Sequence, residues 1–189
     1  ARGGNIVWQS DYGDVTNLDD FNTLANNNGL DLPFNSQDIT TGSITMSAVK
    51  GSLINNVNLE AGKAVTLIAK EGLTNFAYKV FADQNITLTA TEGNVQNISV
   101  LESVKGDVKL VAQNGNVING TSESERAGDI ITLGGTVTLE AYGKDNQDHA
   151  YSVTNYGDII AVNKFGGDDV NAGSIVLKSE FGDVNNYDD

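Results

Sequence analysis

The fold of this chain is decided by a phrase that occurs twice in succession, QNITLTATEGNVQN at 84–97 and GDVKLVAQNGNVIN at 106–119. In the first copy, Ile86, Leu88 and Ala90 fall on one side of an extended chain, while the threonines between them fall on the other. Strict alternation that is rich in β-branched residues predicts a strand with one buried face. A second short alternating stretch follows the glycine of each copy, so each copy predicts two strands.

Related phrases recur along the chain, and their spacing gives a repeat period. The first inward-facing apolar residues of seven copies are Ile6, Ile44, Val65, Ile86, Val108, Val137 and Ile175. The intervals between them are 38, 21, 21, 22, 29 and 38 residues. Three consecutive intervals near 21 set the basic period, and the longer ones contain insertions. A short repeat made of strands predicts an architecture of stacked units.

A third, weaker strand follows in some repeats, as in NVNLEA (56–61), YKVFA (78–82) and ISVLE (98–102). Three short strands in about 21 residues are typical of one coil of a parallel β-helix. We therefore expect an all-β solenoid of about seven coils, right-handed by the usual rule for parallel connections. Its predicted core columns are Ile44, Val65, Leu67, Ile86, Leu88, Val108, Leu110, Val137 and Leu139.

A glycine and an asparagine mark the corner and the end of the second strand in most repeats. The glycines at 13, 51, 72, 93, 115 and 182 are expected to supply a bend with positive φ. Four residues further on, most repeats carry an asparagine: Asn17, Asn55, Asn97, Asn119 and Asn186. Asn75 comes one residue early, as after a single deletion. Asparagines at one position of successive coils would stack about 4.8 Å apart and hydrogen-bond through their amides.

Four insertions, at 18–40, 121–135, 142–155 and 163–172, interrupt the basic period. Loops on a rigid scaffold are common places for binding residues, so these insertions are the candidate sites for a surface ligand. They are also suited to cover the sides of the solenoid. Residues 129–133 alternate again, which predicts an extra strand within the second insertion.

The strongest metal candidates are Asp168 and Asp169, in the glycine-rich stretch GGDD. Calcium prefers oxygen ligands from carboxylates and carbonyls, so this pair is a candidate calcium site. The sequence contains no EF-hand loop and no calcium-binding nonapeptide repeat. The alternative is that such acids are solvated turn residues, which discourage pairing between exposed sheet edges. No other cofactor is expected.

The composition excludes several classes of function. Eleven Lys and Arg against 25 Asp and Glu give a formal net charge of −14, which opposes binding to nucleic acid. No apolar run is long enough to insert into a membrane, and the absence of Cys excludes disulfides and thiolate metal sites. Parallel β-helices include polysaccharide-cleaving enzymes, but the only arginines, Arg2 and Arg126, lie off the strand phrases, so no enzyme is expected.

The phrases at 84–97 and 106–119 resemble the repeats of filamentous-haemagglutinin-like proteins. These are large exported bacterial β-solenoids that include two-partner-secreted adhesins. The resemblance implies an extracellular or bacterial cell-surface location and a solenoid fold. It implies no chemistry, because the motif specifies structure alone, and neither the family's secretion domain nor a toxin end is recognisable.

The two ends of the sequence are copies of one another: GNIVWQSDYGDVTNLDD at 4–20 and GSIVLKSEFGDVNNYDD at 173–189. Ten of the seventeen positions are identical, at an offset of 169 residues. We therefore expect residues 1–189 to be a single solenoid segment, one super-repeat of a longer array. The predicted function is a structural rod or filament segment that stacks end to end with copies of itself or with flanking repeats. The alternative is an adhesin segment that binds a host or neighbouring-cell ligand through its insertions.

Overall fold

The computed structural model describes residues 4–18, 23–25, 42–122, 128–144, 148–163 and 171–187. These residues form 21 strands and no helix. Within this part of the chain there is accordingly no helix long and apolar enough to cross a membrane.

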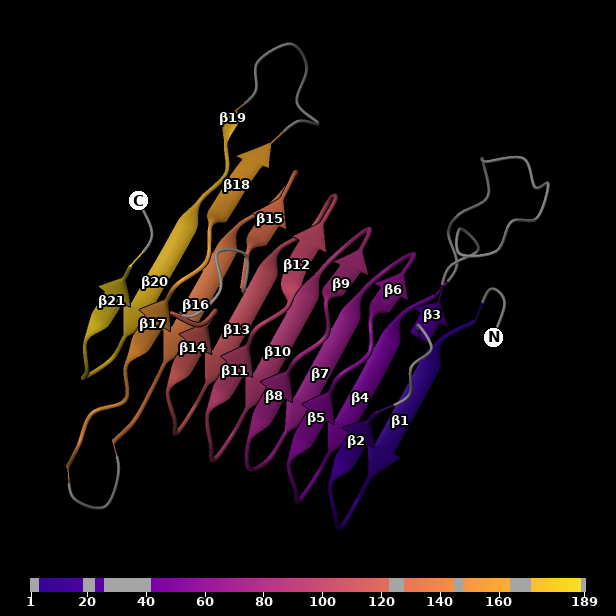
Figure 1. The fold of residues 1–189 in the computed structure, drawn as a ribbon, viewed down its shortest axis with the longest axis horizontal. Helices are drawn as coiled ribbons and strands as arrows, with labels where there is room; N and C mark the ends of the chain where they lie inside the picture. Colours follow the sequence, from indigo (N-terminus) through magenta and orange to yellow (C-terminus); the bar gives the residue numbers. More distant parts are fainter. Residues whose placement is uncertain are drawn as a thin grey trace.

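The strands stack in parallel sheets along the long axis of the molecule (Figure 1). Sheet 1 takes the five-residue strand of each sequence repeat: β1 (Ile6–Ser10), β4 (Ile44–Ala48), β7 (Val65–Ala69), β10 (Ile86–Ala90), β13 (Val108–Ala112), β16 (Val137–Ala141) and β20 (Ile175–Ser179). Sheet 2 takes the three-residue strand after the corner: β2 (Val15–Asn17), β5 (Leu53–Asn55), β8 (Leu73–Asn75), β11 (Val95–Asn97), β14 (Val117–Asn119), β17 (Val153–Asn155) and β21 (Val184–Asn186).

Sheet 3 closes each coil and contains the weaker third strands. Its parallel members are β3 (Thr23–Ala25), β6 (Leu59–Ala61), β9 (Lys79–Ala82), β12 (Val100–Ser103), β15 (Ile130–Thr132) and β18 (Ile159–Asn163). A two-residue strand, β19 (Asn171–Ala172), pairs antiparallel with β18 at the edge of this sheet.

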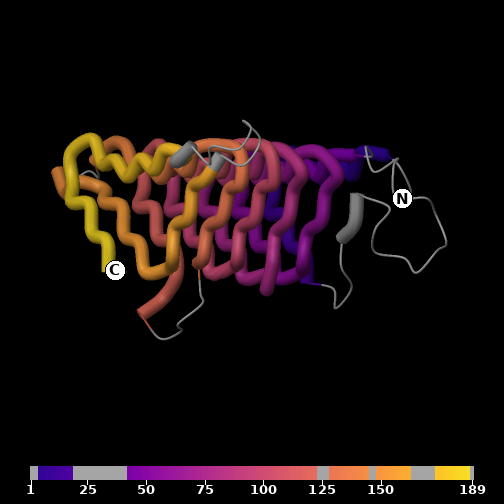
Figure 2. The backbone as a smooth tube through the Cα atoms, turned by 90° about the horizontal axis from the view of Figure 1, so that it is seen from above, coloured from indigo at the N-terminus to yellow at the C-terminus, as the bar shows by residue number. Residues whose placement is uncertain are grey.

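Seven coils follow from this arrangement, and we number them in chain order. Coil 1 contains β1–β3, coil 2 β4–β6, coil 3 β7–β9, coil 4 β10–β12, coil 5 β13–β15, coil 6 β16–β18, and coil 7 β20 and β21. Equivalent phrase positions pair directly: Ile86 lies between Val65 and Val108. Figure 2 shows the coils succeeding one another from one end of the stack to the other. The predicted parallel β-helix of about seven coils is confirmed.

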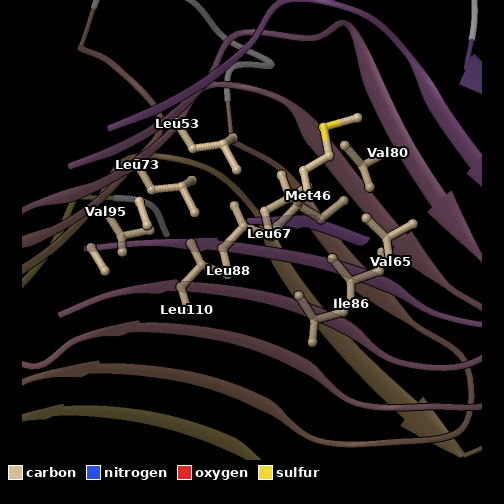
Figure 3. Packing of buried hydrophobic residues seen from close by; sticks show 14 of the residues in the cluster. Met46, Leu53, Val65, Leu67, Leu73, Val80, Ile86, Leu88, Val95 and Leu110 are labelled. Carbon is tan, nitrogen blue, oxygen red and sulfur yellow. The ribbon is translucent and has the colours of Figure 1, made fainter. Parts of the chain in front are cut away.

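The core consists of columns of apolar side chains, one residue from each coil. All nine predicted core residues are fully buried. Leu67, Leu88 and Leu110 follow one another in a single row (Figure 3). The third inward position of sheet 1 is alanine in coils 2–6, as at Ala90, and these alanines are buried as well. Because each side chain packs on its equivalents above and below, a core of this kind is extended by adding coils.

The corner glycines have a different role from the one expected. Among the described residues, positive φ occurs only at Gly120, Gly128, Gly143 and the non-glycine Asp148. At Gly93, a Cβ would instead meet the backbone carbonyl of Glu71 in the preceding coil, and at Gly115 it would meet that of Gly93. Gly93 and Gly115 are required because successive backbones approach too closely to leave room for a side chain, whereas a Cβ on Gly72 would meet only the carbonyl of Asn94 at 3.9 Å.

The insertions are shorter than the sequence suggested, because regular strands lie within them. The segment 18–40 includes β3, which pairs in parallel with β6, and 142–155 includes β17, the sheet 2 strand of coil 6. The extra strand expected at 129–133 is β15, the third strand of coil 5. The segment 163–172 includes β19. Within these segments, residues 19–22, 26–40, 123–127, 145–147 and 164–170 lie outside the described residues.

Candidate functional site

The most extensive polar arrangement in the molecule is a ladder of asparagine side chains at the end of sheet 2. In each step, Nδ2 of one asparagine donates to Oδ1 of its equivalent in the following coil, at 2.7–2.9 Å. The members are Asn17, Asn55, Asn75, Asn97, Asn119, Asn155 and Asn186. All but the last are buried. The ladder therefore runs through every coil and joins each one to the next.

The second proton of the amide secures the corner within a coil. Nδ2 of Asn55, Asn97 and Asn155 also donates to the carbonyl two residues further along the chain, at 2.7–2.9 Å. In coil 5 an insertion follows the asparagine, and Asn119 donates to the carbonyl of Gly128 instead. Both donors of a buried amide are satisfied in this way, which avoids the cost of an unpaired polar group.

The sequence pattern predicted five of the seven ladder positions and treated Asn75 as displaced. Asn75 lies in register, because its corner is shortened ahead of the strand and the strand itself is unshifted. Asn155 was missed, since the insertion before β17 breaks the repeat spacing. The signal that could have found it is the tripeptide Val-Thr-Asn at 153–155, identical to 15–17.

A second set of coil-to-coil bonds lies at the corners, and sequence reasoning did not find it. The residue just before a strand accepts, through its side chain, the backbone N–H of its equivalent in the next coil. The side-chain Oδ1 atom accepts the backbone N–H in three such pairs, at 2.7–2.8 Å: Asp14 with Ser52, Asn94 with Asn116, and Asp107 with Thr136. Further pairs of this kind are Asn5 with Ser43, Asn58 with Lys79, Asn85 with Asp107, Asn116 with Ser152, and Asp129 with Asp158. The acidic corner residues are thus structural acceptors.

Ion pairs on the surface also connect neighbouring coils. Lys70 lies 3.4 Å from Glu92, and Lys109 lies 3.1 Å from Glu140. Lys79 pairs with Glu102 and Lys105 with Asp83, again between consecutive coils. Exposed pairs contribute only about 0–1 kcal/mol each, so they add modestly to the cohesion that the core and the ladders provide.

One tyrosine stands beside the Lys109–Glu140 pair. Partial burial raises the pKa of Tyr142 above its ordinary value of 10.0, and a side-chain hydrogen bond to Glu140 and the charge of Glu140 raise it further. Lys178 of coil 7 lies over the Tyr142 ring, with Nζ 5.1 Å from its centroid. The cluster joins coils 5, 6 and 7 on the outer face of sheet 1.

No metal-binding cluster of three or more His, Cys, Asp or Glu residues occurs in the part of the chain that the structure describes. Every buried side-chain nitrogen and oxygen atom in the described part of the chain has a hydrogen-bond partner. Asp168 and Asp169 lie outside the described residues, so calcium binding at this pair stays a prediction.

Coil 7 differs from the inner coils in that its core columns are open. Ile175 is 49% exposed and Val184 is 44% exposed, whereas their equivalents Val137 and Val153 in coil 6 are fully buried. At the opposite end, in coil 1, Trp8 occupies the column of Met46 and is partly exposed. The two ends of the stack therefore present apolar surface that the inner coils bury against one another.

Comparison with known proteins adds no functional assignment. The sequence matches no protein-family model, no curated protein and no solved structure. The resemblance to filamentous-haemagglutinin-like repeats rests on the repeat phrases alone and stays a prediction.

Proposed function

We propose that this chain is a non-catalytic structural segment of an extracellular rod or filament that extends by stacking coil on coil. The proposal rests on one observation: the buried asparagine side chains hydrogen-bond from each coil to the next. Every step of the asparagine ladder joins one coil to the next, from Asn17 to Asn186. The corner acceptors also join each coil to the next, although there the backbone N–H of the following coil is the donor and the side chain of the preceding coil accepts.

Two further features support a role in continuity along the axis. Four of the five ion pairs in the described residues link consecutive coils, and only Lys144–Asp148 lies within one insertion. The matching stretches 4–20 and 173–189 give both ends of the stack one coil type. A repeat array depends on the match between neighbouring repeats, and matching ends supply it.

The extracellular, bacterial cell-surface location is part of the proposal. It is supported by the resemblance of the repeat phrases to filamentous-haemagglutinin-like proteins. A net charge of −14 is compatible with solubility in a salty exterior.

An adhesin segment is the second candidate, and exposed aromatic residues favour it. Phe76 and Tyr78 lie at the corner between β8 and β9, and they are 49% and 79% exposed. Aromatic residues are enriched where proteins contact partners. In this case the ligand would be a host or neighbouring-cell surface molecule, bound by such corners and by the insertions.

The test is sedimentation velocity of the full chain over a wide range of concentrations. The proposal expects larger species at higher concentration, with a frictional ratio that rises as rods lengthen. The control variant is Ile175→Glu, which places a charge on the open face of coil 7 and should suppress this growth. A monomer at every concentration, together with saturable binding to cells that a Phe76→Ser, Tyr78→Ser variant loses, would favour the adhesin instead.

A further inference from the structure

The outer face of coil 1 contains two glycines for which the isolated molecule shows no steric need. At the same corners of later coils, a Cβ on Gly42 would meet the carbonyl of Gly4, and a Cβ on Gly51 would lie 2.7 Å from the carbonyl of Gly13. Gly182 of coil 7 is restricted in the same way by Tyr151 of coil 6. These close contacts are always with the preceding coil.

Gly4 and Gly13 are free of such contacts among the described residues. A Cβ on Gly4 would meet nothing within 4 Å, and one on Gly13 would lie 3.7 Å from Oγ of Ser10, an ordinary contact. Coil 1 therefore has glycines at the positions where later coils need them to lie close to the backbone of a preceding coil. No described residue of the molecule occupies the place of such a preceding coil.

The outer face of coil 7 offers the complementary surface. Ile175 and Val184 continue the core columns and are 49% and 44% exposed. Asp183 lies just before β21, as Asp14 lies just before β2. Asp14 accepts the backbone N–H of Ser52 in the next coil, and Asp183 is placed to accept the equivalent N–H of a following coil. Burying these apolar side chains against a following coil would remove them from water and favour association.

The two faces also match in register. Both coils have a five-residue strand, a four-residue corner and a three-residue strand, β1 and β2 in coil 1 and β20 and β21 in coil 7. Equal corners allow both sheets to pair at once. Ile175 would then lie on Ile6, Val184 on Val15, and Asn186 on Asn17, so the apolar columns and the asparagine column would continue across the joint.

We infer that coil 7 of one copy binds the outer face of coil 1 of a second copy, with β20 paired in parallel to β1 and β21 to β2. The inference rests on the proposed function and names its joint. A rival geometry follows from the likeness of 4–20 and 173–189: coil 7 could displace coil 1 and pair with coil 2 of the second copy. Direct stacking buries both open faces, whereas displacement would cover one face by uncovering another. The balance of buried apolar surface therefore favours direct stacking.

Engineered disulfides between separate molecules distinguish these geometries. The chain contains no Cys, so each variant introduces the only thiol. Val7 and Val176 point outward from β1 and β20 and are 63% and 40% exposed, so replacing them leaves the core intact. Paired residues of adjacent parallel strands lie about 4.8 Å apart, which is within the Cα range of a disulfide. Under mild oxidation, a mixture of Val7→Cys and Val176→Cys full-length chains should form the mixed disulfide dimer.

Two further mixtures of cysteine variants serve as a negative control and as a test of the rival geometry. Val176→Cys with Thr87→Cys is the negative control, because Thr87 is outward in the same column but lies in coil 4, between coils 3 and 5. Val176→Cys with Thr45→Cys tests displacement, since Thr45 is the residue that Val7 pairs with. A mixed dimer with Thr45→Cys and none with Val7→Cys would overturn the inference in favour of displacement.

Gly13→Ala supplies an independent test. It should leave the melting temperature of the dilute chain unchanged, yet abolish the Val7–Val176 mixed disulfide, because the new Cβ would collide with the coil beneath. An undiminished yield of this disulfide in the Gly13→Ala variant would contradict the proposed packing of coil 7 against coil 1. Rods in sedimentation without any Val7–Val176 disulfide would overturn this joint and leave the proposed function standing. The absence of both would overturn the two together.

Discussion

At the scale of single residues, cohesion depends on side chains that serve two neighbours at once. Asn97 accepts from Nδ2 of Asn75, donates to Oδ1 of Asn119 and donates to the carbonyl of Ser99, all at 2.8–2.9 Å. Its Oδ1 also accepts the backbone N–H of Ser99 at 3.3 Å, so both donor protons and both lone pairs of the side-chain amide have partners. No other side chain of this size offers the same combination, which explains the recurrence of asparagine at this position.

Replacing Asn97 by Ala should therefore destabilise the chain strongly. The change would leave Nδ2 of Asn75 and Oδ1 of Asn119 without their partners, at about 1–3 kcal/mol for each buried group. Urea unfolding measures the loss of unfolding free energy. The control is Gln96→Ala, which alters the outward neighbour on the same strand and should change stability by less than about 0.5 kcal/mol. Equal effects of the two substitutions would contradict the ladder's contribution.

Tyr142 gives a prediction about alkaline pH. Because burial and Glu140 raise its pKa above 10.0, the folded state favours the protonated phenol. Its contribution to stability is complete below pH 10 and is lost as the pH rises from 10 through the raised pKa. A Tyr142→Phe variant should lose less stability over that range than the parent chain does. Urea unfolding below and above pH 10 measures this difference. Tyr12→Phe, at an exposed site, is the control and should follow the parent.

At the scale of elements, the corners decide how closely coils approach. Gly93→Ala should destabilise coils 3 and 4, because its Cβ would meet the carbonyl of Glu71 and displace the backbone. Overpacking of this kind costs about 1–3 kcal/mol. Gly72→Ala is the matched control, since its nearest neighbour would be the carbonyl of Asn94 at 3.9 Å. Thermal unfolding followed by circular dichroism should show a lower melting temperature for Gly93→Ala only. A similar loss in both variants would point to a general need for glycine flexibility.

The elements also show what the sequence could and could not predict. Strand positions and core columns follow from alternation, because an inward residue such as Leu88 must be apolar in any register that buries it. The reason for the glycines did not follow, since a sequence records a missing side chain but not the neighbouring backbone that excludes it. The corner acceptors, such as Asp107, were missed because their partners lie about one period away and are backbone groups, which leave no trace in residue identity. The insertion before Asn155 hid that residue from a search for fixed spacing.

At the scale of the whole molecule, a solenoid is held together by contacts between adjacent coils, so its ends open more easily than its middle. Gln113 and Glu180 follow equivalent sheet 1 strands, and each donates its N–H to the preceding coil, at 2.9 and 3.0 Å. In dilute solution, hydrogen exchange should be faster at Glu180 of coil 7 than at Gln113 of coil 5. As the concentration rises, exchange at Glu180 should slow while Gln113 stays unchanged. A concentration-independent rate at Glu180 would contradict stacking on coil 7.

In the proposed rod, the core columns and the asparagine ladder of one copy continue into the next. Electron cryomicroscopy of the full chain at high concentration would show whether they do. We expect unbranched rods in which the strand spacing of about 4.8 Å along the axis continues through each joint, with β20 of one copy beside β1 of the next. Discrete particles of one chain, or rods whose strand spacing is interrupted at the joint, would contradict this continuity.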